Sequence, residues 1–220
     1  MSSTDRQERL AGRRLYLCTA DRPDLDTFLD ACLAGGVDLV QLRDKHLDAR
    51  PLIDRARVAA AVCRDHGVPF ILNDRPDLAL EAGADGVHVG QDDAPPALAR
   101  RLLGPDAIIG FSTHAPAELD ASAGEPVDYV STGPVNATPT KPGRPGTGLG
   151  YLRYAAATVA DTRPWFVTGG VTPATVGDMA AAGAGRFVVV RWLTESDDPK
   201  AAAHALAQAI GEAIARQSTG

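Results

Sequence analysis

The 220-residue chain carries 22 Lys and Arg against 28 Asp and Glu, a formal net charge of −6, which provides no broad basic surface for nucleic acid. No apolar stretch reaches the roughly 18 residues of a membrane span, and the polar N-terminus lacks the apolar core of a signal peptide. Three scattered cysteines, Cys18, Cys32 and Cys63, argue against a disulfide framework or a zinc cluster. The composition therefore predicts a cytoplasmic protein that binds neither nucleic acid nor membrane.

Short apolar runs alternate with Ala-rich helical patterns along nearly the whole chain, which indicates βαβ construction. The predicted strands are 15–18, 39–42, 70–72, 87–89, 108–111, 129–131, 165–167 and 187–190. The predicted helices are 25–33, 52–63, 97–103, 149–159, 175–182 and 201–214, with shorter pieces at 77–82 and 116–121. A run of eight such units in this length favours an α/β protein with a compact (β/α)8 TIM barrel.

The alternative fold is a doubly wound open sheet. Such a sheet normally carries a glycine-rich fingerprint after its first strand, whereas residues 19–23 read TADRP. No composition shift or low-complexity linker marks a second domain. We therefore predict a single barrel domain over 13–216, preceded by a flexible N-terminus at 1–12.

The C-terminal ends of the strands are where a barrel of this kind places its chemistry. The second predicted strand runs into Gln41-Leu42-Arg43-Asp44-Lys45. Alternation sends Gln41, Arg43 and Lys45 to one side and the intervening Leu42 and Asp44 to the other. An amide and two cations directed into the barrel mouth predict a clamp for a polyanion, although a solvated charged loop would also account for Lys45.

Carboxylates follow the third and fourth predicted strands. Asn73-Asp74 and Gln91-Asp92-Asp93 stand one β/α unit apart, so Asp74 and Asp93 are expected at the same rim of the sheet. Either one alone is better explained as the cap of a turn or helix. Because Mg²⁺ takes one or two carboxylates and completes its shell with water and phosphate oxygens, the pair predicts a magnesium–phosphate site.

The fifth strand ends in Ser112, whose hydroxyl can donate to a phosphate, and in His114, which is more simply explained as structural. His88, in the middle of the fourth strand, is predicted to be a core histidine. The segment 133–148 is too rich in Pro and Gly for helix or strand and is interpreted as an active-site lid. Its candidate phosphate donors are Thr138, Thr140, Lys141 and Arg144.

The seventh and eighth strands end where barrels commonly bind phosphate. Gly169-Gly170 precedes a predicted helix, so backbone amides there can approach an anion closely. Val190 and Arg191 end the eighth strand. Together with the clamp and the carboxylates, this predicts a diphosphate site and a monophosphate site in one mouth, with no nucleophilic Ser or Cys arrangement beside them.

These motifs resemble those of the thiamine phosphate synthase family. The matching strings are QLRDK at 41–45, NDRPDLALEAGADGVHVGQDD at 73–93, GFSTH at 110–114, GPVNATPTK at 133–141 and GAGRFVVVR at 183–191. They extend from the second predicted strand to the eighth, and the long string at 73–93 is the most specific.

The resemblance implies a (β/α)8 transferase that joins 4-amino-2-methyl-5-hydroxymethylpyrimidine diphosphate to a thiazole (carboxy)ethyl phosphate, giving thiamine phosphate and pyrophosphate. Pyrophosphate would leave first with the help of Mg²⁺, and the thiazole nitrogen would then attack the methylene carbon. These small molecules are the implied partners, and the oligomeric state is left open, a homo-oligomer included. By motif match, the pyrimidine diphosphate is assigned to Gln41, Leu42, Arg43, Asp44, Lys45, Asn73, Ser112 and Lys141, the thiazole phosphate to Thr138, Pro139, Thr140, Gly170, Val190 and Arg191, and Mg²⁺ to Asp74 and Asp93.

One departure from the family pattern concerns the monophosphate site, where the family usually has Ser at the position of Arg191 and a small residue at that of Trp192. We interpret Arg191 as a charged replacement for a hydroxyl donor. Three alternative functions would make different demands on these residues. A thiazole tautomerase of similar fold would need a proton-transfer residue, for which His114 is the candidate, and no carboxylate pair. A non-catalytic sensor of the pathway should lack part of the metal or clamp set. A sugar-phosphate barrel enzyme would leave the diphosphate side unused.

Overall fold

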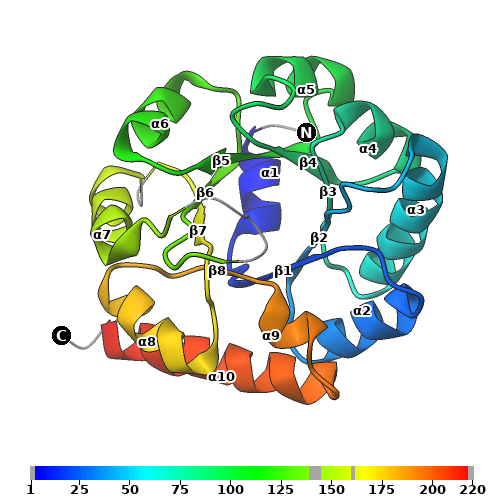
Figure 1. The fold of residues 1–220 in the computed structure, drawn as a ribbon. Helices are drawn as coiled ribbons and strands as arrows, with labels where there is room; N and C mark the ends of the chain where they lie inside the picture. Colours follow the sequence, from blue (N-terminus) through cyan, green and yellow to red (C-terminus); the bar gives the residue numbers. More distant parts are fainter. Residues whose placement is uncertain (1–2, 139–144, 160–161, 218–220) are drawn as a thin grey trace.

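A computed structural model describes residues 3–138, 145–159 and 162–217 of the chain. Its parallel strands follow one another around a closed barrel in chain order, so the predicted (β/α)8 fold is confirmed (Figure 1). The strands are β1 (Leu15–Thr19), β2 (Leu39–Leu42), β3 (Phe70–Asn73), β4 (Gly86–Val89), β5 (Ile108–Thr113), β6 (Tyr129–Thr132), β7 (Trp165–Val167) and β8 (Phe187–Val189).

Helices surround the barrel, and the long α10 closes the ring between α8 and α2 (Figure 1). The helices are α1 (Ser3–Leu10), α2 (Leu25–Ala34), α3 (Ala49–Asp65), α4 (Pro76–Ala82), α5 (Pro96–Leu103), α6 (Pro116–Ala121), η1 (Ser122–Gly124), α7 (Gly148–Val159), α8 (Pro173–Ala181), α9 (Arg191–Thr194) and α10 (Pro199–Gln217). In the described part of the chain, no helix is long and apolar enough to span a bilayer.

The apolar core has two parts because strand side chains alternate between the barrel interior and the helices. The outer part lies between strands and helices and is dominated by Leu, Val and Ala. The interior part consists of Leu10, Tyr16, Leu39, Ile71, Ile108, Tyr129 and Phe166, with Val188 packed against them. Its aromatic rings meet edge to face, with centroids 5.3 Å apart for Tyr16 and Phe166 and 5.4 Å apart for Tyr129 and Phe166. These rings fill the barrel below the mouth.

The sequence predicted a flexible N-terminus at 1–12, whereas the structure has helix α1 over residues 3–10. Leu10 at its end is fully buried in the interior cluster. The Arg6 guanidinium pairs with Asp128, 2.7 Å from Nε to Oδ1, and Arg9 pairs with Asp85. Asp85 and Asp128 immediately precede β4 and β6, so α1 is attached at the N-terminal ends of the strands, opposite the mouth.

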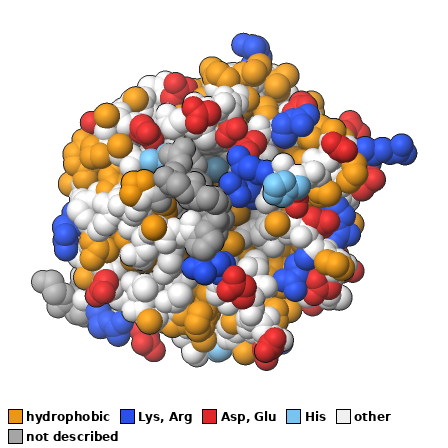
Figure 2. Space-filling model, in the orientation of Figure 1, with side chains coloured by type: hydrophobic (Ala, Val, Ile, Leu, Met, Phe, Trp, Pro, Cys, Tyr) orange, Lys and Arg blue, Asp and Glu red, His pale blue; other side chains and the backbone are white. Residues whose placement is uncertain are grey.

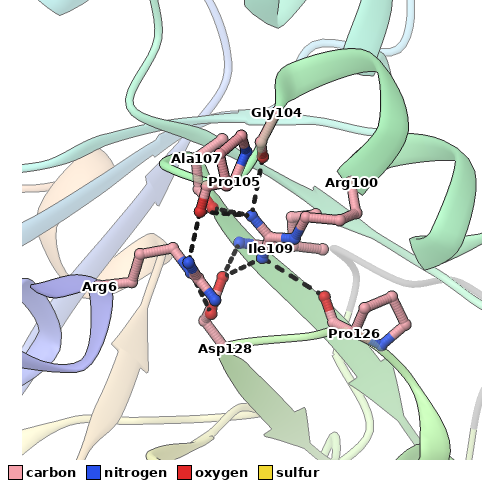
Figure 3. A network of polar contacts seen from close by, with 8 residues as sticks. All are labelled: Arg6, Arg100, Gly104, Pro105, Ala107, Ile109, Pro126 and Asp128. Atoms are coloured by element: carbon pink, nitrogen blue, oxygen red, sulfur yellow. Dashed lines mark hydrogen bonds and ion pairs between the residues drawn. The ribbon is translucent and has the colours of Figure 1, made fainter. Parts of the chain in front are cut away.

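A buried carboxylate organises this attachment (Figure 3). Asp128 Oδ2 accepts from the Arg100 guanidinium at 2.7 Å and from the Ile109 backbone amide at 2.8 Å. Arg100 also donates to the carbonyl oxygens of Gly104, at 3.1 Å, and Ala107, at 2.6 Å. The network ties α1, the end of α5 and the starts of β5 and β6 together at the closed end of the barrel.

Candidate active site

A cavity opens at the C-terminal ends of the strands, and Lys and Arg side chains gather around the centre of that face (Figure 2). It brings together residues from nearly every strand, including eight of the site residues predicted from the sequence. The predicted site residues among its lining are Gln41, Arg43, Asn73, Ser112, Thr138, Gly170, Val190 and Arg191. Tyr16, Cys18, His88, Ser131 and Trp192 line it as well.

The QLRDK string divides as alternation predicts. Gln41 is 5% exposed and lines the cavity, as does Arg43, whose backbone amide donates to the Thr19 carbonyl at 2.7 Å. Leu42 instead belongs to the outer core between strands and helices. The Asp44 carboxylate turns into its own loop, where it accepts from the backbone amides of His46 at 2.8 Å and Leu47 at 3.0 Å.

The loop environment sets the charge of Asp44. Burial by itself would raise the pKa of this carboxyl, but backbone amides from His46, Leu47 and Asp21 outweigh it and hold the pKa below its usual value. Asp44 is therefore an anion that shapes the turn after β2. Neither Asp44 nor Leu42 is among the residues that line the cavity.

The two predicted metal carboxylates are brought together at the rim. The Asp74 carboxyl lies within hydrogen-bonding reach of Asp93, and Lys45 Nζ lies 3.0 Å from Asp74 Oδ2. Asp93 Oδ2 also accepts from the Gly90 backbone amide at 2.8 Å. Burial and the neighbouring Asp74 raise the pKa of Asp93, while Gly90 and Lys45 act in the opposite sense. Two carboxylates held this closely repel each other, and a bound divalent cation would offset the repulsion beyond the single charge that Lys45 supplies.

The backbone at Asp74 is unusual. Its φ of 62° is the one positive value among non-glycine residues that the structure describes, and Asp tolerates this left-handed region better than most residues. The amide of Asp74 donates to the His88 carbonyl at 2.8 Å, which anchors it to the end of β4. The turn thus aims the Asp74 carboxylate toward Asp93 on the next β/α unit, an arrangement that costs local strain.

The oxygen donors of this pair suit Mg²⁺. In the described residues no cluster of three or more His, Cys, Asp or Glu side chains could hold a metal. An ion at Asp74 and Asp93 would therefore take its remaining ligands from water and from a bound phosphate, which is the usual arrangement for Mg²⁺.

On the other side of the mouth, two glycines follow β7. Gly169 and Gly170 have φ values of 101° and 78°. A Cβ at Gly169 would lie 2.5 Å from the Val135 backbone nitrogen, so no side chain fits there. At Gly170 the positive φ makes any side chain strained. The Thr175 hydroxyl donates to the Gly170 carbonyl at 2.7 Å and fixes this turn to the start of α8. The turn and the adjoining helix start present backbone amides suited to an anion.

Strand β8 is one residue shorter than predicted, ending at Val189. Arg191 begins the short helix α9, and its exposed side chain lies at the cavity beside Val190. Trp192 donates its indole N–H to the Ala202 carbonyl of α10 at 3.1 Å. Of the loop residues, Thr138 lines the cavity, whereas Pro139, Thr140, Lys141 and Arg144 lie outside the described residues.

His114 and His88 differ in their position relative to the cavity. His114 Nδ1 lies 2.6 Å from the Gly133 carbonyl oxygen, and His114 is not among the residues lining the cavity. His88 is buried, as predicted for a core histidine, but its ring also lies at the cavity floor between Tyr129 and Ser112. The sequence prediction missed this role, which inward alternation along β4 could have suggested.

Comparison with known proteins agrees with this geometry. A family model described as thiamine monophosphate synthase matches residues 15–193. This chain belongs to that family. It is 50% identical over 211 residues to a thiamine-phosphate synthase of Streptomyces avermitilis, covering 94% of this chain and 98% of that protein. A protein of the same name from Thermobifida fusca is 50% identical over 214 residues, covering 95% and 97%.

A solved structure supports the same conclusion. The thiamine phosphate pyrophosphorylase of Pyrococcus furiosus superposes with a TM-score of 0.83 at 25% identity, covering 95% of this chain and 98% of that chain. Membership of the family makes this chain an enzyme of the thiamine-phosphate synthase type, a transferase of thiamine biosynthesis with small-molecule substrates.

Proposed function

We propose that the enzyme joins an aminopyrimidine-methyl diphosphate to a thiazole phosphate, giving thiamine phosphate and pyrophosphate with Mg²⁺ held by Asp74 and Asp93. The observation that carries the proposal is the juxtaposition of two anion sites in one mouth. Arg43 and Asn73 line one side of the cavity. They are followed in the chain by Lys45 and Asp74, which pair with each other at the rim beside Asp93 and are not themselves among the lining residues. The Gly169-Gly170 turn and Arg191 line the other side. Such a mouth fits two phosphorylated substrates held side by side.

The charged side chains indicate which side of the mouth would bind the diphosphate. Arg43, as a planar fork, and Lys45, as a point charge, would bind the diphosphate and stabilise the negative charge that grows on it as it departs. Bound Mg²⁺ would add Lewis-acid stabilisation of the same oxygens. We assign Asn73 and Ser112 to the pyrimidine diphosphate as well, with Lys141 from the loop as a further cation.

The second substrate would be held by the monophosphate side. Backbone amides at Gly170, the cavity-lining Val190 and the guanidinium of Arg191 would bind the thiazole phosphate, together with 138–140 of the loop. Holding the thiazole nitrogen close to the pyrimidine methylene carbon makes the bond-forming step intramolecular in effect. No nucleophile from the protein is needed, so positioning and exclusion of water are the main tasks of the chain.

The tautomerase alternative is not favoured, because His114 is directed to a backbone carbonyl and the carboxylate pair would have no task. We place the enzyme in the cytoplasm, as its composition predicts.

The test is pyrophosphate release from purified enzyme, with each substrate and Mg²⁺ omitted in turn. Release should require all three components, and Asp74→Asn should lower it at least about 100-fold, since a charged metal ligand is lost. Asp77→Asn, at an exposed carboxylate of α4 paired with Arg75, is the matched control and should leave release unchanged. Release by wild type without Mg²⁺, or an unaffected Asp74→Asn, would contradict the metal assignment.

A further inference from the structure

Within the barrel, a connected row of buried polar side chains links β2 to β5 and reaches the cavity at both ends. Gln41 Nε2 lies 2.6 Å from the Tyr16 hydroxyl, which lies 2.8 Å from the Tyr129 hydroxyl. Tyr129 contacts His88 Nδ1 at 3.0 Å, and His88 Nε2 lies 2.8 Å from Ser112 Oγ. None of the five is more than 6% exposed. We call this row of Gln41, Tyr16, Tyr129, His88 and Ser112 the interior relay.

A glycine makes room for the relay at its centre. A Cβ added at Gly110 of β5 would lie 2.1 Å from Tyr129 Cζ and 2.5 Å from His88 Nδ1. Glycine weakens a strand interior, so its presence there often marks a close approach of another group. The Tyr129–His88 contact could not form over any other residue at position 110. The relay is therefore a feature built into the strands and not an incidental contact.

The Cys18 contact with Gln41 assigns a direction to the hydrogen bonds of the relay. The Cys18 thiol donates to Gln41 Oε1 at 3.3 Å, which leaves Gln41 Nε2 to donate to the Tyr16 oxygen. Tyr16 can then give its proton to Tyr129, and Tyr129 can give its own to His88 Nδ1. With Nδ1 accepting, the ring carries its proton on Nε2 and donates to Ser112. Burial raises the pKa of both tyrosines, so each keeps the proton that the relay requires.

The two ends of the relay present opposite hydrogen-bonding character to the cavity that they both line. Ser112 Oγ accepts from His88 and from the Ser131 hydroxyl, 3.4 Å away. Its own proton has no acceptor among the described residues, so it is available to a ligand. Among the described residues, Gln41 Oε1 accepts from the weak Cys18 thiol donor, so this oxygen keeps a lone pair for a ligand. The cavity thus offers an acceptor at Gln41 and a donor at Ser112.

We propose that Tyr16, Tyr129 and His88 are positioning residues that fix this polarity and thereby select an amino-substituted ring over its oxo analogue. An aminopyrimidine presents an amino donor and ring-nitrogen acceptors, which complements an acceptor at Gln41 and a donor at Ser112, whereas the oxo form replaces the amino donor by a carbonyl acceptor. This inference rests on the proposed function, since it specifies how the pyrimidine substrate is recognised. A site built to hydrogen-bond one pattern rejects the other because its buried groups are left unpaired.

The experiment compares Tyr129→Phe and Tyr16→Phe with wild type, using the aminopyrimidine diphosphate and its 4-oxo analogue. Each variant should raise KM for the aminopyrimidine about tenfold and lower the amino-over-oxo ratio of kcat/KM by a similar factor. KM for the thiazole phosphate should stay within about twofold. Because the hydroxyls belong to one relay, the double variant should lose little more than either single variant.

Tyr151→Phe is the matched control. This buried hydroxyl donates to Thr113 Oγ1 at 2.7 Å, packs α7 against β5 and does not line the cavity. Removing the Tyr151 hydroxyl should lower the free energy of unfolding about as much as Tyr16→Phe or Tyr129→Phe does, while leaving both KM values and the amino-over-oxo ratio unchanged. His88→Gln, whose amide can reach the position of Nε2, should retain more of the ratio than His88→Ala.

The possible results separate the two claims. Folded Tyr16→Phe and Tyr129→Phe enzymes with the wild-type amino-over-oxo ratio would overturn the relay while leaving the proposed function intact. If Tyr129→Phe fails to fold, Tyr16→Phe alone decides the matter. No turnover by wild type with both substrates would refute the proposed function, and the relay inference with it.

Discussion

The clearest consequence for stability concerns Asp128 at the closed end of the barrel. Its side chain is 6% exposed and meets two guanidinium groups at 2.7 Å each, those of Arg6 and Arg100. Asp128→Asn would leave these two cations facing a neutral amide. The NH₂ group of that amide cannot accept a hydrogen bond, so it would face one of the donors that the carboxylate now accepts from. Breaking a buried ion pair from one side costs about 3–5 kcal/mol. We expect a loss near the lower end of that range because both arginines keep carbonyl partners, Arg6 that of Pro105 and Arg100 that of Ala107.

Urea unfolding measures this loss, and in a protein of this size it corresponds to a fall in Tm of about 10 °C. Glu81→Gln is the control, because it removes one partner of an exposed ion pair with Arg57, where the side chains are 62% and 52% exposed. That change should cost less than about 1 kcal/mol. Activity of Asp128→Asn at 25 °C should persist, since the mouth is at the other end. A free energy of unfolding equal to that of Glu81→Gln would refute the reasoning.

Three further predictions concern other parts of the molecule. Arg191→Ala should raise KM for the thiazole phosphate about tenfold without changing that for the pyrimidine diphosphate, and an unchanged thiazole KM would remove Arg191 from the phosphate site. Gly110→Ala should destabilise the protein by about 2 kcal/mol or more in urea unfolding, because the new methyl group collides with Tyr129 and His88; wild-type stability would contradict the packing described. Burial raises the pKa of Asp38 to about 6, so this carboxyl binds its proton more tightly in the folded state than in the unfolded state. The free energy of unfolding should therefore decrease as pH rises through this pKa, and Asp38→Asn should flatten its pH dependence in that range. Parallel pH dependences for wild type and Asp38→Asn would contradict this assignment.

The strands and most helices were predictable because their apolar periodicity is strong and local. The carboxylates Asp74 and Asp93 could also be placed at one rim, since each follows a strand of the same parallel sheet. Alternation correctly turned Leu42 and Asp44 away from Gln41 and Arg43, although the family motif groups all of them together. These features depend on residues close in sequence.

The parts that the sequence did not predict depend on distant partners. Helix α1 has little apolar character of its own, and it is held by ion pairs to Asp85 and Asp128, far along the chain. The interior relay joins Tyr16 to Tyr129 across 113 positions, so the residues around either tyrosine do not predict their contact. Two local signals existed: alternation along β4, which points His88 inward, and the glycine at 110, which interrupts an apolar strand and is explained by the close contact.

The most direct test of the account is the stoichiometry of products from the complete reaction. Enzyme, Mg²⁺, the aminopyrimidine diphosphate and the thiazole phosphate should yield thiamine phosphate and pyrophosphate in equal amounts, both quantified from the same sample. Pyrophosphate formed without thiamine phosphate, or neither product while the thiazole phosphate still binds, would contradict the proposed condensation.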